Sequence, residues 1–249
     1  MAYIDLKNAS LDLPIYDVQS RSLKKRLASL RNRSPDASER SDTVVLRALN
    51  ELSFRIENGD RLGLVGHNGA GKSTLLRVLA GIYAPSSGVV ETQGKTVPLL
   101  DISLGMDENS TGRQNIRLRG LLLGMSDEEI AEKAEEIAAF SGLDSFLDLP
   151  IRTYSSGMRV RLGFAISTAV NADILLLDEV IGVGDASFKE KANRRLAELH
   201  ERSEIVVLAL HDNRTILETC DKALWLDKGS VRMLGPADEV LRAYEASVS

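Results

Sequence analysis

The sequence predicts an α/β fold with an N-terminal antiparallel β portion and a helical subdomain, and three observations carry this prediction. The apolar run at residues 62–66 is strand-like, and those at residues 174–177 and 205–210 are typical of buried strands. A glycine-rich loop follows the first run and precedes a helix-favouring segment. Residues from about 109 to 172 favour helix, which indicates a helical subdomain inserted between the strands.

Two strand-like segments flank a basic insertion near the N-terminus. Residues 3–16 alternate apolar and polar side chains, and residues 43–56 contain two further strand-like runs. Between them, residues 20–33 have helical spacing and residues 34–42 have the composition of a flexible connector. We therefore expect the antiparallel β portion to be interrupted by a helix and connector over residues 20–42.

Cap and turn signals define further elements. Ser126, followed by acidic residues, predicts the start of a helix that Gly142 ends. Lys228 and Gly229 separate two strand-like runs and predict the turn of a β-hairpin. A short amphipathic helix is expected after Pro236.

Composition and charge exclude several classes of protein. The 249 residues are 43% apolar and 27% charged, which is typical of a soluble globule with a substantial core. The net charge of −5 argues against a dedicated nucleic-acid binder, so no nucleic-acid partner is expected. The single cysteine, Cys220, cannot form an internal disulfide, and the N-terminus lacks the pattern of a signal peptide. No segment approaches the roughly 20 apolar residues that span a bilayer, so membrane contact should be peripheral.

The first chemical motif is "GHNGAGKS", residues 66–73, which matches the phosphate-binding loop (P-loop) G-x-x-x-x-G-K-[ST]. Its glycines allow backbone N–H groups to surround a phosphate at a helix N-terminus. Lys72 is expected to reach the β- and γ-phosphates and Ser73 to ligate Mg²⁺, whereas the ring of His67 is not expected to be a ligand. The alternative is a glycine-rich turn without a ligand. The predicted nucleotide-contacting residues are Gly66, His67, Asn68, Gly69, Ala70, Gly71, Lys72, Ser73 and Thr74.

The second motif is "ILLLDE", in which a buried strand ends in two carboxylates. Asp178 would emerge beside the P-loop and hold Mg²⁺ directly or through water. Glu179 is placed to act as the general base that polarises the attacking water. Acidic residues also end ordinary strands, so this motif gains its meaning from its pairing with a P-loop.

The stretch "YSSGM", residues 154–158, precedes this strand and decides which kind of nucleotide hydrolase is expected. Here the chain resembles the nucleotide-binding subunits of ABC transporters, and it is thus similar to a P-loop NTPase of the ABC type. In that family the corresponding signature loop faces ATP·Mg²⁺ on the other copy of a head-to-tail dimer. The resemblance therefore implies that Ser155, Ser156 and Gly157 contact nucleotide across a homodimer. Taken alone, a Ser-Gly helix start is an ordinary N-cap.

Other positions follow the family pattern or depart from it. Asp185 occupies the place of the D-loop aspartate, which the family uses for communication between the two sites. His211 occupies the place of the histidine that contacts the γ-phosphate, although a histidine at a strand end is commonly structural. Residues 97–116 contain no glutamine that fits the family's Q-loop, so this role is unassigned. "YSSGM" and "DEVIGVGD" also depart from the commoner family sequences.

Four separate stretches are similar to the ATPase subunits of exporters for lipid-linked O-antigen, capsule-type glycans and teichoic acids. They are "PIYDVQSRSLKKRL", "STGRQNI", "YSSGM" followed by "RVRLGFAI", and "LLLDEVIGVGD". This resemblance implies one nucleotide-binding domain over residues 1–249. Its basic helix within residues 20–42 would be a gate helix near the membrane, and residues 109–172 would be a helical subdomain with the signature loop.

The basic helix and the tyrosine before it have two interpretations each. Residues 20–33 carry six basic side chains and no acidic one, which suits anionic lipid headgroups or a pyrophosphate-linked substrate, but also suits a solvated helix face. Tyr16 is a candidate for stacking on adenine, or else a half-buried strand tyrosine.

The expected function is ATP-driven export of a lipid-linked polysaccharide with a separate transmembrane permease. Glu179 would act as base, while Lys72, Ser155 and His211 would stabilise charge in the transition state. The expected location is the cytoplasmic face of the inner membrane, with peripheral attachment. Since the chain stops at Ser249, we expect no C-terminal carbohydrate-binding domain. The alternatives are export of teichoic acid or of a non-glycan substrate, and an ATP-binding adaptor outside transport.

Overall fold

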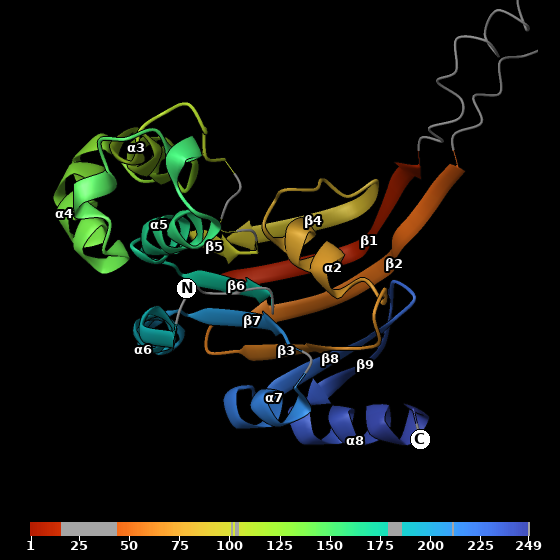
Figure 1. Cartoon of the computed structure of the whole chain (residues 1–249). Helices are drawn as coiled ribbons and strands as arrows, with labels where there is room; N and C mark the ends of the chain where they lie inside the picture. Colours follow the sequence, from red (N-terminus) through yellow and green to blue (C-terminus); the bar gives the residue numbers. More distant parts are fainter. Residues whose placement is uncertain (16–43, 101, 103–104, 179–185, 211, 249) are drawn as a thin grey trace, which may run out of the picture.

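The computed structural model describes residues 1–249 except 16–43, 101, 103–104, 179–185, 211 and 249. The described residues form a six-stranded sheet, a three-stranded antiparallel sheet and a helical subdomain that lies to one side of them (Figure 1). The predicted α/β class, the N-terminal antiparallel portion and the helical subdomain are therefore confirmed. The expected helix and connector over residues 20–42 lie outside the described residues.

The central sheet is parallel apart from its last strand. Its strands, in spatial order, are β5 (Thr96–Leu99), β6 (Ile174–Asp178), β7 (Ile205–Ala209), β3 (Arg61–Val65), β8 (Lys222–Asp227) and β9 (Ser230–Pro236). β8 and β9 form the predicted antiparallel hairpin, and Lys228 and Gly229 at its turn have positive φ of 48° and 78°. This is the backbone conformation that a two-residue hairpin turn requires.

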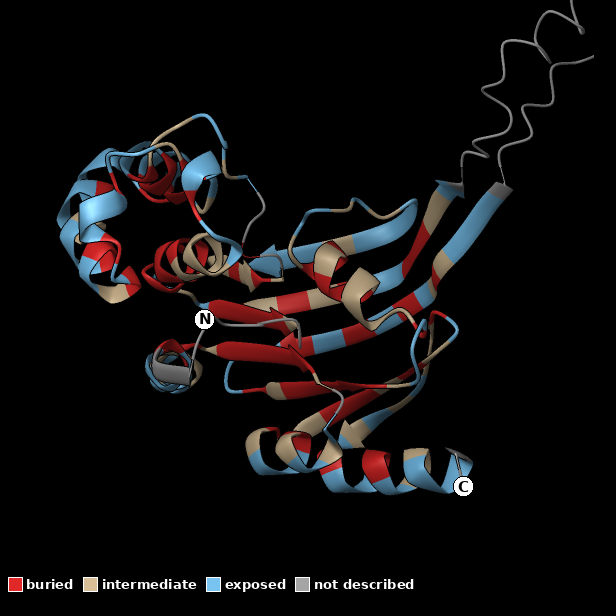
Figure 2. Ribbon diagram, in the orientation of Figure 1, coloured by how far each residue is buried: buried red, intermediate tan, exposed pale blue. Residues whose placement is uncertain are grey.

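The core lies on both faces of the central sheet. On one face, Leu62, Leu64 and Leu176 pack with the first helix after the P-loop and with the three-stranded sheet. On the other face, Leu175 and Val206 pack with the helical subdomain. Alternate side chains of each strand point to opposite faces of the sheet. Because both faces are covered, β3, β6 and β7 are buried almost throughout (Figure 2). This explains their uninterrupted apolar sequences.

The second sheet has the order β2-β1-β4, with β1 (Tyr3–Ile15), β2 (Val44–Glu57) and β4 (Ser87–Gln93). The two runs that sequence patterns separate at Asn50 and Glu51 belong to one strand, β2. Glu51 has φ of 50°, and the register with β1 shifts nearby, so the strand continues through an irregularity. β4 was not predicted, because nearly all its residues are exposed and it lacks an apolar alternation.

The helices pack on both faces of the central sheet. They are α2 (Lys72–Leu79), α3 (Gly112–Leu122), α4 (Asp127–Ser141), α5 (Ser156–Thr168), α6 (Ala186–Arg202), α7 (Asn213–Thr219) and α8 (Ala237–Val248), with 3-10 turns at Asp144–Phe146 and Ile151–Thr153. α4 begins with a capping box between Ser126 and Glu129 and ends at Gly142, whose φ is 64°, as the sequence predicts. In the described part of the chain, we find no helix with the length and apolar character of a membrane span.

Candidate functional site

The P-loop connects β3 to α2 and depends on glycine at specific positions. Gly66, Gly69 and Gly71 have positive φ of 147°, 80° and 109°. A Cβ on Gly66 would overlap the carbonyl oxygen of Leu226 in β8, so the loop packs against the neighbouring strand at this point. Around Gly69 there is open space. The loop is therefore held at its base and accessible at its tip.

We expect Gly66→Ala to lower the free energy of unfolding by about 2–4 kcal/mol, because it adds a backbone clash to the strain of positive φ. Gly69→Ala is the matched control, with positive φ but no atom within 4 Å of the added Cβ, and should cost about 1 kcal/mol. Urea unfolding of both variants measures the difference. Equal losses would contradict the role of Leu226 in packing the loop.

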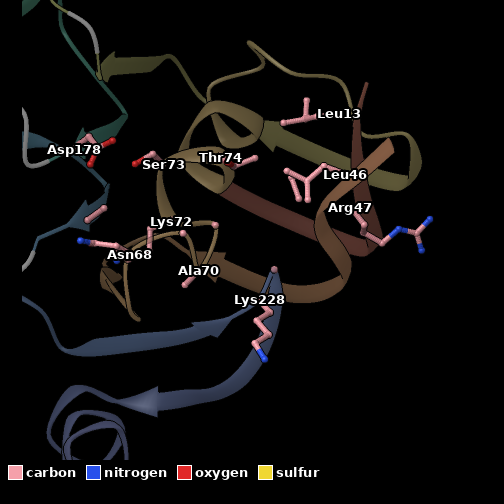
Figure 3. A pocket seen from close by; sticks show the side chains of 15 residues that line it. Leu13, Leu46, Arg47, Asn68, Ala70, Lys72, Ser73, Thr74, Asp178 and Lys228 are labelled. Atoms are coloured by element: carbon pink, nitrogen blue, oxygen red, sulfur yellow. The ribbon is translucent and has the colours of Figure 1, made fainter. Parts of the chain in front are cut away.

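A pocket of about 520 Å³ lies against the P-loop and α2 (Figure 3). It is lined by Leu13, Leu46, Arg47, Ala48, Asn68, Gly69, Ala70, Gly71, Lys72, Ser73, Thr74, Asp178, Ala209, Lys228 and Gly229. The predicted residues Asn68 to Thr74 are thus brought together with Asp178. Gly66 and His67 belong to the same loop but do not line the pocket.

Lys72 is held by backbone carbonyls of its own loop. Its Nζ donates to the carbonyl oxygen of Gly66 and, at 3.3 Å, to that of His67. Burial lowers the pKa of Lys72, and the negative charge of Asp178 acts in the opposite direction. A phosphate placed in the pocket would favour the protonated lysine further, because it adds negative charge near a partly desolvated ammonium group.

Ser73 and Asp178 form the oxygen-rich end of the pocket. Asp178 is the last residue of β6, and Ser73 is in the first turn of α2. Figure 3 shows the Ser73 hydroxyl and the Asp178 carboxylate on the same side of the pocket. A hydroxyl and a carboxylate are suitable ligands for Mg²⁺, which takes few protein ligands when phosphates and water complete its shell. The residues present therefore fit a magnesium ion.

The opposite end of the pocket is apolar and was not predicted. Leu13 of β1 and Leu46 and Ala48 of β2 form this end, while Lys228 and Gly229 close one side from the β8–β9 turn. Figure 3 shows Leu13 and Leu46 on the wall and the guanidinium of Arg47 pointing away from the P-loop. These residues come from distant parts of the chain and carry no local motif, so sequence reasoning had no signal for them.

Ser155 starts α5 as an N-cap. Its hydroxyl accepts a hydrogen bond from the backbone N–H of Met158 at 3.2 Å, so the ordinary capping role is present. Ser155 and Ser156 are exposed, and Gly157 has only the Ser155 hydroxyl near the position of an added Cβ, at 3.9 Å. Tyr154 is buried and donates to the carbonyl oxygen of Phe146 at 2.7 Å. The buried Tyr154 therefore fixes the position of the helix start, and the two serines that follow it are exposed.

The predicted residues Tyr16, Glu179, Asp185 and His211 lie outside the described residues. Two described residues near them in sequence are placed: Asp178 of β6 and Ala209 of β7 pair with each other in the sheet and both line the pocket. The roles given to Tyr16, Glu179, Asp185 and His211 stay predictions. Ser155, Ser156 and Gly157 do not line the pocket of their own chain.

A family model and similar proteins of known function indicate the same family. The family model described as ABC transporter matches residues 49–182. An O-antigen export system ATP-binding protein of Yersinia enterocolitica is 42% identical over 93% of this chain and 97% of that protein.

Two further relatives are longer than this chain. One is an O-antigen export system ATP-binding protein of Myxococcus xanthus, 40% identical over 84% of this chain and 48% of that protein. The other is a teichoic acids export ATP-binding protein of Lactococcus lactis, 42% identical over 81% of this chain and 43% of that protein. The chain thus matches less than half of the length of these two relatives.

Solved structures support the fold. A dimeric ATP-binding cassette in a post-hydrolysis state, bound to ADP and Pi, matches with a TM-score of 0.66 and 20% identity over 94% of this chain and 98% of that one. An ATP-binding subunit of an ABC transporter matches with a TM-score of 0.68 and 19% identity over 97% of this chain and 93% of that one.

Proposed function

This chain belongs to the ABC transporter family, and from that premise we propose that it is the ATP-hydrolysing subunit that powers export of a lipid-linked polysaccharide through a separate permease. The observation that carries the proposal is the 42% identity to an O-antigen export ATP-binding protein over 97% of that protein's length. The pocket supports the ATP-hydrolysing part of this proposal, because the P-loop with its lysine and a strand-end carboxylate line one cavity.

In the proposed ATP site, the phosphates lie along the P-loop. Backbone N–H groups from Asn68 to Ser73 and the N-terminus of α2 would bind the phosphate oxygens, and Lys72 would neutralise the β- and γ-phosphates. Ser73 and Asp178 would hold Mg²⁺, which supplies additional charge stabilisation for the transferring phosphoryl group. The adenine would rest toward Leu13 and Leu46, where the wall is apolar.

We assign the remaining chemistry to a head-to-tail homodimer. Exposure of Ser155 and Ser156, outside the pocket of their own chain, supports their contact with nucleotide on a second copy. Glu179 would then take a proton from the attacking water, while Lys72 and His211 stabilise charge on the γ-phosphate. Closure of the dimer around two nucleotides and its reopening after hydrolysis would drive the permease. Asp185 would connect the two sites.

The groove between α2 and α3 suits contact with the permease. A cavity of about 940 Å³ there is lined by Arg77, Ala80, Ile82, Tyr83, Lys95, Thr96, Pro98, Leu100, Gly105, Arg119, Leu122, Leu123 and Gly124. Three of these residues, Pro98, Leu100 and Gly105, belong to segment 97–116, where the resemblance to the family implies a Q-loop that contacts the transmembrane partner. Leu122 at its rim is 65% exposed, and Leu118 and Leu121 on the same helix are also exposed. A protein partner would bury this apolar surface.

We expect Leu122→Glu to reduce co-purification with the permease about tenfold or more, because it places a charge in an apolar contact. ATP hydrolysis by the isolated chain should be unchanged. Leu217→Glu on α7, which is 49% exposed and outside the groove, is the matched control and should co-purify normally. Equal retention of the permease by both variants would exclude the groove as the contact surface.

The decisive experiment is affinity purification of the chain from gently solubilised native membranes, with phosphate release measured on the product. A polytopic protein and a lipid-linked glycan at stoichiometric levels would support polysaccharide export. The relative from Lactococcus lactis makes teichoic acid the specific second candidate, and analysis of the bound lipid separates the two. ATP binding without phosphate release, or the absence of a membrane partner, would contradict the proposal and favour an adaptor.

A further inference from the structure

The turn of the β8–β9 hairpin is hydrogen-bonded to the P-loop. Gly229 at its turn donates to the carbonyl oxygen of Ala70 at 2.9 Å, and its own carbonyl accepts from the N–H of Asn50 at 2.8 Å. A Cβ on Gly229 would lie within 2.5 Å of the Ala48 carbonyl oxygen. The hairpin turn is therefore fixed between β2 and the P-loop, where it can determine the position of the loop.

A second connection joins the same hairpin to the start of the loop through side chains. The Nε2 atom of His67 lies 3.1 Å from Oδ1 of Asp227 in β8. The other carboxylate oxygen of Asp227 accepts from Nε and from an Nη atom of Arg232 in β9, at 3.0 and 2.8 Å. Arg232 thus orients Asp227, and Asp227 is oriented toward His67.

The partners of His67 favour its protonated form. Its Nδ1 lies 2.8 Å from the carbonyl oxygen of Asn68, and its Nε2 faces Asp227. Arg232, and secondly His67, lower the pKa of Asp227, so this carboxylate is ionised and only accepts hydrogen bonds. Both ring nitrogens therefore face acceptors. A neutral imidazole has one N–H, so only the imidazolium form makes both hydrogen bonds.

The backbone of His67 links this ring to the phosphate-binding lysine. The carbonyl oxygen of His67 accepts from the N–H of Ala70 at 3.1 Å and from Nζ of Lys72 at 3.3 Å. Contact between the His67 ring and Asp227 restricts rotation of the His67 backbone. It therefore limits movement of the His67 carbonyl oxygen that binds Nζ of Lys72. Asp227 itself does not line the pocket.

We propose that Asp227, oriented by Arg232, is a positioning residue of the nucleotide site that fixes the P-loop through the imidazolium of His67. This inference rests on the proposed ATP site but not on the export substrate. The hydrogen bond from the Nδ1 atom to Asn68 and the contact with Asp227 raise the pKa of His67, against smaller opposing effects of burial and of Lys72. Lys228, at the turn, is a further cation near Asp227. The ion pair of His67 with Asp227 is complete below the pKa of His67 and is lost as pH rises through it.

The test is a double-mutant cycle on the affinity for Mg·ADP, measured by calorimetry at pH 6.5. ADP keeps the β-phosphate contact of the P-loop and is not hydrolysed. We expect His67→Ala and Asp227→Ala each to weaken binding about fivefold, and the double variant also about fivefold, because the two residues act as a unit. A loss of about 25-fold in the double variant would mean independent effects and would overturn the proposal. Wild-type affinity in Asp227→Ala would overturn it equally.

Asp227→Asn gives a second measurement, the pH dependence of the affinity for Mg·ADP, which a general structural role of Asp227 would not change. The amide that this substitution introduces can donate to the neutral ring through its NH₂ group and accept from Arg232 through its oxygen. Between pH 6.5 and 8.5, the affinity of the wild type should fall about threefold relative to that of Asp227→Asn. The ratio of the two affinities at each pH cancels the effect of the titration of ADP itself, which is the same for both proteins. A ratio that does not change with pH would contradict a role for the imidazolium.

The ring of His67 is also observable directly. The chain has three histidines, so an NMR titration is assigned by comparison with His67→Gln. Asp227→Asn should lower the pKa of His67, whereas Asp238→Asn, which removes one charge of an exposed ion pair with Arg242 in α8, should not. An unchanged His67 titration in Asp227→Asn would exclude the contact. Because all these measurements use the isolated chain, failure to find a permease leaves them intact, and their failure leaves the export proposal intact.

Discussion

Lys72→Ala is expected to reduce ATP turnover by about 100-fold or more and to weaken nucleotide binding. Nζ of Lys72 lies over the loop, held by the carbonyl oxygens of Gly66 and His67, in a pocket that also contains Asp178. An ammonium group placed there stabilises the charge on the β- and γ-phosphates, and loss of one such preorganised group typically costs about two to three orders of magnitude. Phosphate release and calorimetric titration with ADP measure the two effects.

Lys228→Ala is the matched control for this prediction. Lys228 lines the same pocket but extends from the β8–β9 turn rather than from the phosphate-binding loop. Its removal should change turnover less than about threefold, because general positive charge is worth less than a positioned cation. If Lys72→Ala keeps wild-type binding and turnover, the P-loop assignment is wrong. If both variants lose activity equally, the pocket acts only through its net charge.

Local signals in the sequence predicted those parts of the molecule that depend on neighbouring residues. α4 begins after Ser126 and ends at Gly142 as expected, because capping depends on hydrogen bonds within one turn. Lys228 and Gly229 form the expected hairpin turn, since two consecutive residues with positive φ satisfy its geometry. The P-loop was recognised for the same reason: its glycines and its lysine act within one short segment.

The unpredicted features depend on contacts between distant segments. β4 is exposed along most of its length, and its pairing with β1 leaves no periodic signal in its own sequence. Leu13 and Leu46 form one wall of the pocket because β1 and β2 pair although residues 16–43 separate them in sequence, so neither is marked as a site residue by its neighbours. Register and pairing are properties of the whole sheet, which single-segment patterns do not contain.

His67 illustrates the same limit within a recognised motif. The sequence predicts no role for its ring, because the P-loop motif places no requirement on that position. In the structure, the ring contacts Asp227, which lies 160 residues further along the chain. The charge of Asp227 and its orientation by Arg232 give the ring a defined partner. Only the tertiary arrangement reveals this connection.

Glu179→Gln is expected to lower turnover by about 10²–10⁴-fold while ATP binding persists, because it removes the general base and keeps the size of the side chain. Glu179 lies outside the described residues, and its neighbour Asp178 lines the ATP pocket. With hydrolysis blocked, Mg·ATP should hold two copies together. Size-exclusion chromatography with light scattering should then show a dimer with Mg·ATP and a monomer with Mg·ADP. Persistence of wild-type turnover would remove Glu179 from the role of base.

Adding Gly157→Glu to this variant tests whether the second copy completes the site. The position of a Cβ on Gly157 has only the Ser155 hydroxyl within 4 Å, at 3.9 Å, so the substitution should leave the fold of one chain intact. Gly157 does not line the pocket of its own chain, so binding of Mg·ADP should also be intact. A carboxylate at the start of α5 would, however, oppose the γ-phosphate of the partner's nucleotide, since it brings like charge to a helix N-terminus that otherwise attracts anions. The double variant should therefore remain monomeric with Mg·ATP. A dimer that forms equally well would show that the signature loop does not contact nucleotide across the interface, even if Glu179 is the base.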